Sequence, residues 1–109
     1  MTRSLDLLHG TLDLLVLRTL AWESMHGYAI AQFVKARTDG AIVIESAALY
    51  QALHRLEKRK LVRAAWGMSE TNRRARFYEL TAAGRGALKA QSMDLRAYVS
   101  ALYRVLDAR

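Results

Sequence analysis

Side chains that could bind phosphate are concentrated in one stretch of this sequence, between His54 and Arg76. These 23 residues hold eight arginines and lysines against two glutamates, a net charge of +6. The other 86 residues hold nine positive and eight negative side chains, a net charge of +1. Clustered cations on a folded domain are the electrostatic signature of a surface that binds nucleic acid. A basic surface that serves only solubility is the alternative.

The sequence lacks the residue patterns that a metal site or a catalytic nucleophile would need. The chain has no cysteine, which excludes disulfides, thiolate metal sites and cysteine nucleophiles. His9, His26 and His54 lack the i, i+4 spacing of a zinc hydrolase, and no Walker loop, dinucleotide fingerprint or nucleophile elbow occurs. We therefore expect no enzyme activity, no cofactor and no metal, and we interpret His26 as a cap or packing residue at the start of a helix.

Length and composition indicate one soluble domain. The 109 residues are 52% hydrophobic and 25% charged, an ordinary globular composition. Asp6, Asp13 and Arg18 interrupt the leucine-rich start, so no apolar run approaches the ~18 residues of a membrane span. The start also lacks the basic region and cleavage site of a secretory signal. We expect a cytoplasmic protein that does not enter the membrane.

Hydrophobic periodicity predicts four helices and one β-hairpin that together position the cations. The third helix shows the pattern best, because an apolar stripe at 3-1-3 spacing lies opposite a polar face. We expect Ser24, Ser46 and Thr81 to cap the second, third and fourth helices, and Asp39-Gly40 to end the second. The expected elements are helices over 5–22, 24–38, 47–59 and 82–106, and strands over 61–67 and 75–80.

This order of elements is that of a winged helix-turn-helix. The fold class is therefore mainly α with a small β-hairpin, followed by one C-terminal dimerisation helix. In such a domain the third helix enters the DNA major groove, and the hairpin reaches the backbone or the minor groove alongside. We divide the chain into a DNA-binding domain over 1–81 and a dimerisation helix over 82–109.

The expected DNA contacts fall on the third helix and the hairpin. Arginine and lysine there would neutralise phosphates, whereas Gln51 and His54 could hydrogen-bond to base edges and Ala48 could contact a thymine methyl. Tyr50 could contact a phosphate or pack against the hairpin, and Arg74 and Arg76 could instead pair with Glu70 and Glu79. The full expected set is Ser46, Ala48, Tyr50, Gln51, His54, Arg55, Lys58, Arg73, Arg74 and Arg76.

Two helices carry more apolar surface than one small chain can cover. The first expected helix is apolar nearly all round, and the last has leucine or valine at 4-3-4 spacing, which is typical of a packed helix pair. A second copy of the chain is the expected cover. The expected interface residues are Leu8, Leu12, Leu15, Leu95, Val99, Leu102 and Leu106.

Four ordered blocks resemble one protein family. They are GTLDLLVLRTL at 10–20, MHGYAIAQ at 25–32, LYQALHRLEKRKLV at 49–62 and WGMSETNRRARFYELTAAGR at 66–85. Together they are similar to the PadR family of bacterial transcriptional regulators, and the stretch SETNRRARFYELT at 69–81 looks most like its short group common in acidobacteria. The resemblance implies a homodimeric winged helix-turn-helix protein that usually represses a promoter. Where the family often has Gly-Ser and then Pro, Ala47, Ala48 and Gln51 stand here, which suggests a changed operator.

The resemblance also implies a site for a small aromatic or lipophilic effector between the subunits. Several members stack flat ligands on a tryptophan of the last helix, and the matching position here is Leu95. An aliphatic lining accepts apolar ligands but offers no ring to stack on. We favour a plain packed dimer interface over a ligand site. The candidate lining residues are Asp13, Leu14, Leu95, Val99 and Leu102.

The basic surface leaves a second function open. A winged helix can also be a protein-interaction module that docks an acidic partner, and charge alone does not separate this from double-stranded DNA. The leading hypothesis is a homodimeric repressor that binds a pseudo-palindromic operator.

Overall fold

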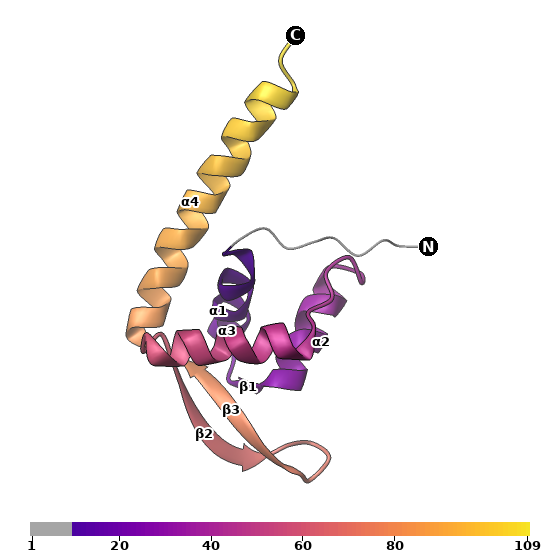
Figure 1. Cartoon of the computed structure of the whole chain (residues 1–109), viewed down its shortest axis with the longest axis vertical. Helices are drawn as coiled ribbons and strands as arrows, with labels where there is room; N and C mark the ends of the chain where they lie inside the picture. The colour runs from indigo at the N-terminus through magenta and orange to yellow at the C-terminus, as the bar shows by residue number, and fades with distance from the viewer. Residues whose placement is uncertain (1–9) are drawn as a thin grey trace.

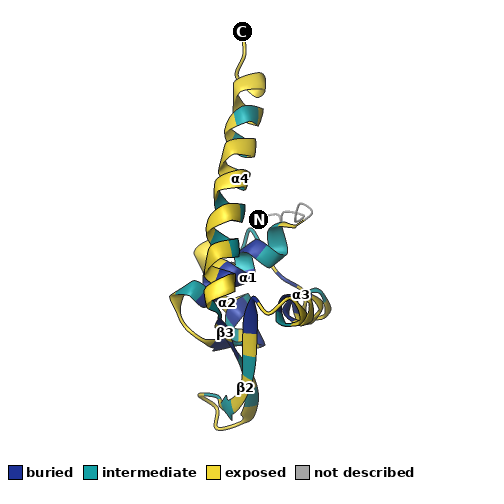
Figure 2. Cartoon of the chain, turned by 90° about the vertical axis from the view of Figure 1, so that its left-hand side faces the viewer, coloured by how far each residue is buried: buried dark blue, intermediate teal, exposed yellow. Residues whose placement is uncertain are grey.

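Three helices form a body from which a β-hairpin and a long fourth helix project in opposite directions (Figure 1). The computed structural model describes residues 10–109. The hairpin lies at one end of the molecule and the free end of α4 at the other in both views (Figures 1 and 2). The elements are α1 (Thr11–Trp22), β1 (Met25–His26), α2 (Gly27–Arg37), α3 (Ser46–Lys58), β2 (Val62–Met68), β3 (Arg74–Leu80) and α4 (Ala82–Leu106).

The core lies between α1, α2, α3 and the base of the sheet. The predicted stripe of α3 is buried, and its polar face points outward (Figure 2). α1 contributes Leu17 and Leu20, and the sheet contributes Val62 and Leu80. This single apolar cluster fixes α3 against the body, so that its other face is free for a partner.

The sheet has three antiparallel strands in the order β1-β3-β2, one more than the expected hairpin. Met25 pairs with Tyr78 and His26 with Phe77, which ties the start of α2 to the hairpin. The predicted cap of α2 was wrong: His26, not Ser24, is the N-cap, and its Nδ1 accepts a hydrogen bond from the Ala29 N–H at 3.2 Å. The interpretation of His26 as a capping residue is confirmed.

Two other helix starts differ from the prediction. α1 begins at Thr11, because Gly10 takes a left-handed conformation with φ 83°, and the part of the expected helix over 5–9 lies outside the described residues. α3 begins at Ser46 itself, and Glu45 takes the N-cap position without a side-chain bond. A serine can cap a helix only from the position before its first turn, so Ser46 is one residue too late.

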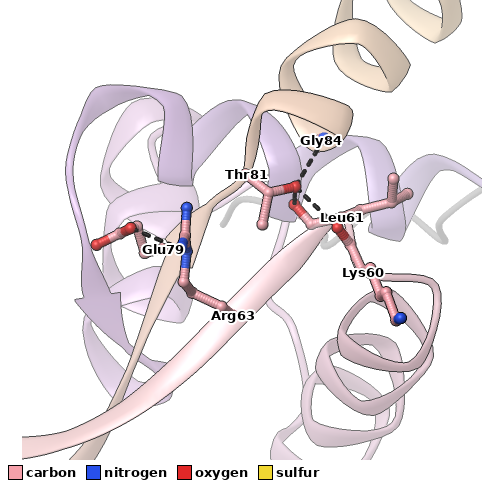
Figure 3. Close-up of polar contacts among 6 residues, drawn as sticks. All are labelled: Lys60, Leu61, Arg63, Glu79, Thr81 and Gly84. Atoms are coloured by element: carbon pink, nitrogen blue, oxygen red, sulfur yellow. Dashed lines mark hydrogen bonds and ion pairs between the residues drawn. The ribbon is translucent and has the colours of Figure 1, made fainter.

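The predicted Thr81 cap of α4 is confirmed, and it forms part of a joint with the end of α3 (Figure 3). The Thr81 hydroxyl accepts the Gly84 N–H at 3.0 Å, and it lies 2.8 Å from the Lys60 carbonyl and 3.0 Å from the Leu61 carbonyl. The Thr81 N–H also donates to the Leu61 carbonyl. Lys60 turns the chain there with a φ of 62°. These bonds fix the direction in which α4 leaves the body.

Beyond this joint α4 extends past the body. A compact chain of this length has a radius of gyration of about 13 Å, whereas that of this chain is 15.3 Å. Large apolar side chains stay exposed along the projecting half of the helix (Figure 2). No helix among the described residues is long and apolar enough to cross a membrane.

Candidate nucleic-acid interface

The outer face of α3 is a polar surface with a shallow open hollow of about 470 Å³, lined by Tyr50, Gln51, His54 and Arg55. The first three are exposed, and none makes a side-chain hydrogen bond within residues 10–109. Ser46 and Lys58 are exposed at the two ends of the same helix, while Ala48 is half-buried. The structure thus brings the expected base-reading residues together on one accessible helix face.

Tyr50 is held by a close approach to α2. A Cβ atom built on Gly27 would lie 3.0 Å from the Tyr50 hydroxyl oxygen and 3.1 Å from its ring. A side chain at position 27 would crowd the tyrosine, which would have to shift by a few tenths of an ångström. Tyr50 thus packs on the first residue of α2, and the alternative that it also packs against the hairpin stays open.

Three arginines of the basic stretch are paired with carboxylates. Arg55 bonds to Asp13 of α1 at 2.7 Å, and Arg76 bonds to Glu57 of α3 at 2.8 Å. The hydrogen bond that Arg55 donates to Asp13, together with the negative charge of Asp13, raises the pKa of the Arg55 guanidinium. The third pair joins Arg63 and Glu79 across the hairpin at 3.1 Å.

These pairs correct two expectations. Arg76 does not pair with Glu79, nor Arg74 with Glu70, since the ion pairs in the described structure use other partners. The Asp13 carboxylate bonds to Arg55 of α3, and its place beside an effector stays a prediction. Arg55 and Arg76 lie on the expected surface, but the adjacent carboxylates reduce the charge that they offer to phosphate.

Five cations of the stretch make no ion pair within the described residues. Lys58, Arg59 and Lys60 end α3, while Arg73 and Arg74 lie at the tip of the hairpin. The tip loop is closed by the Ser69 N–H, which donates to the Arg73 carbonyl at 2.8 Å, and by Asn72 with a φ of 60°. The positive charge therefore forms two groups, one at the end of α3 and one at the hairpin tip.

Arg74 is held in a way that the sequence analysis missed. Its guanidinium carbon lies 4.5 Å from the centroid of the Trp66 ring, a cation–π contact across the hairpin. Trp66 is 61% exposed. The hairpin register could have predicted this contact. It pairs position 66 with position 76, and this makes position 74 the diagonal cross-strand neighbour of Trp66.

The expected interface residues that the structure describes lie on α1 and α4 and differ in burial. Leu12 and Leu15 of α1 are half-buried, as are Leu95 and Val99 of α4, whereas Leu102 and Leu106 are exposed. Leu14, expected near an effector, is instead buried in the chain's own core. Leu8 lies outside the described residues.

Comparison with known proteins gives the family. Residues 16–90 match the Transcriptional regulator PadR-like family. The chain belongs to this family. It is also similar to an uncharacterized protein of Lysinibacillus sphaericus, with 33% identity over 88 residues that cover 81% of this chain and 80% of that protein.

Solved structures of PadR-like regulators share the fold. A transcriptional regulator from Clostridium thermocellum superposes with a TM-score of 0.80 at 27% identity, covering 87% of this chain and 89% of that one. A PadR family transcription regulator from Clostridium difficile R20291 gives 0.77 at 25% identity, covering 89% and 99%. The PadR-like assignment and the fold class are thereby confirmed.

Membership in the PadR-like family makes this chain a transcriptional regulator and not an enzyme. Regulation by this family implies DNA binding, in agreement with the exposed face of α3. Among residues 10–109, no group of three or more histidine, aspartate or glutamate side chains could hold a metal ion.

Proposed function

We propose that the protein is a homodimeric repressor that binds a pseudo-palindromic operator in double-stranded DNA. The observation that carries the proposal is the arrangement of α3 and the hairpin. Both lie at the end of the molecule away from the tip of α4, and both carry cations that make no ion pair among residues 10–109. Residues up to 81 form the DNA-binding domain in this proposal, and α4 is the dimerisation helix.

Within this interface the residues have different roles. Gln51 and His54, in the middle of the exposed face of α3, are assigned to base edges, with Ser46 and Ala48 at the start of the helix. Tyr50, Lys58, Arg73 and Arg74 are assigned to phosphates. Arg55 and Arg76 contribute weaker phosphate contacts, because each shares its charge with a carboxylate.

Support for the dimer comes from the stripe along α4. At 100° per residue, Leu88, Leu95, Val99, Leu102 and Leu106 share one side of the helix. The stripe packs on the core at Leu88 and ends fully outside the body, where Leu106 is 74% exposed. Apolar surface that continues beyond the body of one chain needs a second chain to cover it.

DNA binding is tested by a salt titration and a footprint on the gene's own promoter. For a labelled duplex, the logarithm of the association constant should fall linearly with the logarithm of salt concentration, by about 0.9 per phosphate contact. Gln51→Ala should change which operator is preferred, whereas Lys58→Ala should weaken binding to all sequences alike. Affinity for duplex DNA that does not depend on salt would refute the proposal, and displacement by an acidic protein would favour the interaction-module alternative.

The dimer is tested with two matched double variants of α4. Leu95→Asp with Leu102→Asp puts two charges on the stripe, whereas Ala97→Asp with Ser100→Asp puts the same charges on the opposite side. The first should give a 12 kDa species by light scattering and lose operator affinity, because the second half-site is no longer linked. The second should stay dimeric. Equal behaviour of the two variants would contradict the proposed interface.

The same interface is where a small aromatic or lipophilic effector would act. Asp13 and Leu14 are engaged within the chain, so the remaining candidates are Leu95, Val99 and Leu102. A ligand that binds the folded dimer raises its melting temperature by mass action. A thermal-shift screen of planar aromatic and lipophilic cationic compounds tests this. If no compound shifts the melting temperature at saturating concentration, the effector site is wrong and the proposed repressor acts without an effector.

A further inference from the structure

One face of the hairpin, which we call the inner face, runs from the core to the exposed tip. Val62, Ala64, Trp66 and Met68 of β2 alternate onto it, opposite Leu80, Tyr78, Arg76 and Arg74 of β3. At its base Val62, Tyr78 and Leu80 are buried. In the middle Arg76 bonds to Glu57, so this face is the one that looks toward α3. At its outer end Trp66, Met68 and Arg74 are exposed.

Three of the four arginines of this hairpin are held, in two chemically different ways. A carboxylate holds Arg76 and another holds Arg63, and each carboxylate cancels the positive charge that it positions. Arg74 has no carboxylate partner among residues 10–109; it lies against the Trp66 ring instead. An indole attracts the guanidinium through its ring face and adds no negative charge.

A guanidinium that lies over a ring can also keep its hydrogen-bonding edge available. The five N–H donors of a guanidinium lie in its plane, so a ring against one face leaves them free to bond phosphate oxygens. An unsupported arginine at a hairpin tip would instead have to be ordered when DNA binds, which lowers affinity. Trp66 can therefore hold the Arg74 guanidinium in place without neutralising its positive charge.

We propose that Trp66 is a positioning residue that holds the Arg74 guanidinium at the inner face of the hairpin, ready to bind a DNA phosphate. This inference rests on the proposed DNA-binding function and adds to it a residue outside the expected contact set. Exposed cation–π contacts of this kind correspond to about a two- to fivefold change in an equilibrium constant. That is the loss of DNA affinity expected per subunit when the ring is removed.

The experiment is a double-variant cycle with a labelled duplex of arbitrary sequence. Trp66→Ala should weaken binding about two- to fivefold per subunit, and Trp66→Phe should restore most of it, because phenylalanine keeps a ring face. Arg74→Ala should weaken binding and reduce the salt slope by about 0.9 per subunit. In the Arg74→Ala background, Trp66→Ala should have no further effect.

A matched control is available at the other tryptophan. Trp22 is also 61% exposed, and Arg37 lies 5.9 Å from its ring centroid, on α1 and α2 and not on the hairpin. Trp22→Ala should leave DNA affinity unchanged. Melting of Trp66→Ala at the wild-type temperature would separate loss of binding from loss of folding.

Two results would overturn the inference. One is wild-type affinity of Trp66→Ala; the other is an equal loss from Trp66→Ala with or without Arg74, which would mean that the indole acts on its own. The wild-type salt titration reports separately on the underlying function. If wild-type protein fails to bind duplex DNA, the proposed function is wrong and the role of Trp66 is wrong with it.

Discussion

Gly84, in the first turn of α4, is the residue that most directly sets how this helix joins the body. A Cβ atom at Gly84 would overlap the carbonyl oxygen of Leu61 and lie 2.6 Å from Cδ1 of Leu80. Ordinary carbon contacts begin near 3.5 Å, so Gly84→Ala needs a displacement of about 1 Å in this joint.

The expected cost follows from what must move. Overpacking beside buried Leu80 costs about 1–3 kcal/mol. Shifting the Leu61 carbonyl strains its two bonds to Thr81, at about 1 kcal/mol each. Alanine returns about 1 kcal/mol of helix propensity. The free energy of unfolding should therefore fall by about 2–4 kcal/mol.

Gly86 provides the matched control, two residues later in the same helix. A Cβ atom there would have no neighbour within 4 Å. Gly86→Ala should raise the free energy of unfolding by about 0.5–1 kcal/mol, because alanine has a higher helix propensity and makes the unfolded chain less flexible. Urea denaturation of both variants at one protein concentration measures the difference. A Gly84→Ala protein as stable as wild type would refute the reasoning and show that the joint is not tightly packed.

Three further predictions concern α1, α2 and the sheet. Asp13→Asn should free Arg55 for phosphate and steepen the salt dependence of DNA binding by about 0.9 per subunit, measured by anisotropy; an unchanged slope would argue against release. Gly27→Ala should displace Tyr50 and weaken DNA binding several-fold at nearly constant melting temperature; unchanged affinity would remove Tyr50 from the interface. Burial raises the pKa of Tyr78 above its usual value, so the folded state favours the neutral phenol, and stability should fall as pH rises through about 10. Tyr78→Phe should lessen that fall in melts between about pH 9 and 11, and parallel curves would contradict this.

Local patterns in the sequence predicted most of the fold. The 3-1-3 stripe of α3 and the threonine before α4 each depend on residues within a few positions, where periodicity and capping act. β1 has two residues and no pattern of its own. It exists because β3 offers a free edge, which only the assembled chain provides.

The electrostatics of the site were less predictable for a similar reason. The clustering of cations on α3 and the hairpin could be predicted from the sequence, but their ion pairs could not. Asp13 and Arg55 are 42 residues apart in the chain, and Glu57 and Arg76 are 19 apart. No local pattern relates such residues, because α1, α3 and β3 meet only after packing. The Trp66–Arg74 contact is intermediate, since a known hairpin register would have predicted it.

The paired arginines have a consequence for how the regulator finds its site on a chromosome. Each phosphate contact multiplies non-specific affinity about fivefold when salt falls from 1 M to 0.15 M. Arg55 and Arg76 are the paired arginines of the proposed DNA surface, so full loss of both contacts would lower the affinity of each subunit for random DNA about 25-fold. Because a genome offers millions of competing sites, weaker retention on them leaves more protein for the operator. On the proposed function, we expect Asp13 and Glu57 to shorten the search for the operator, because they weaken binding to random DNA.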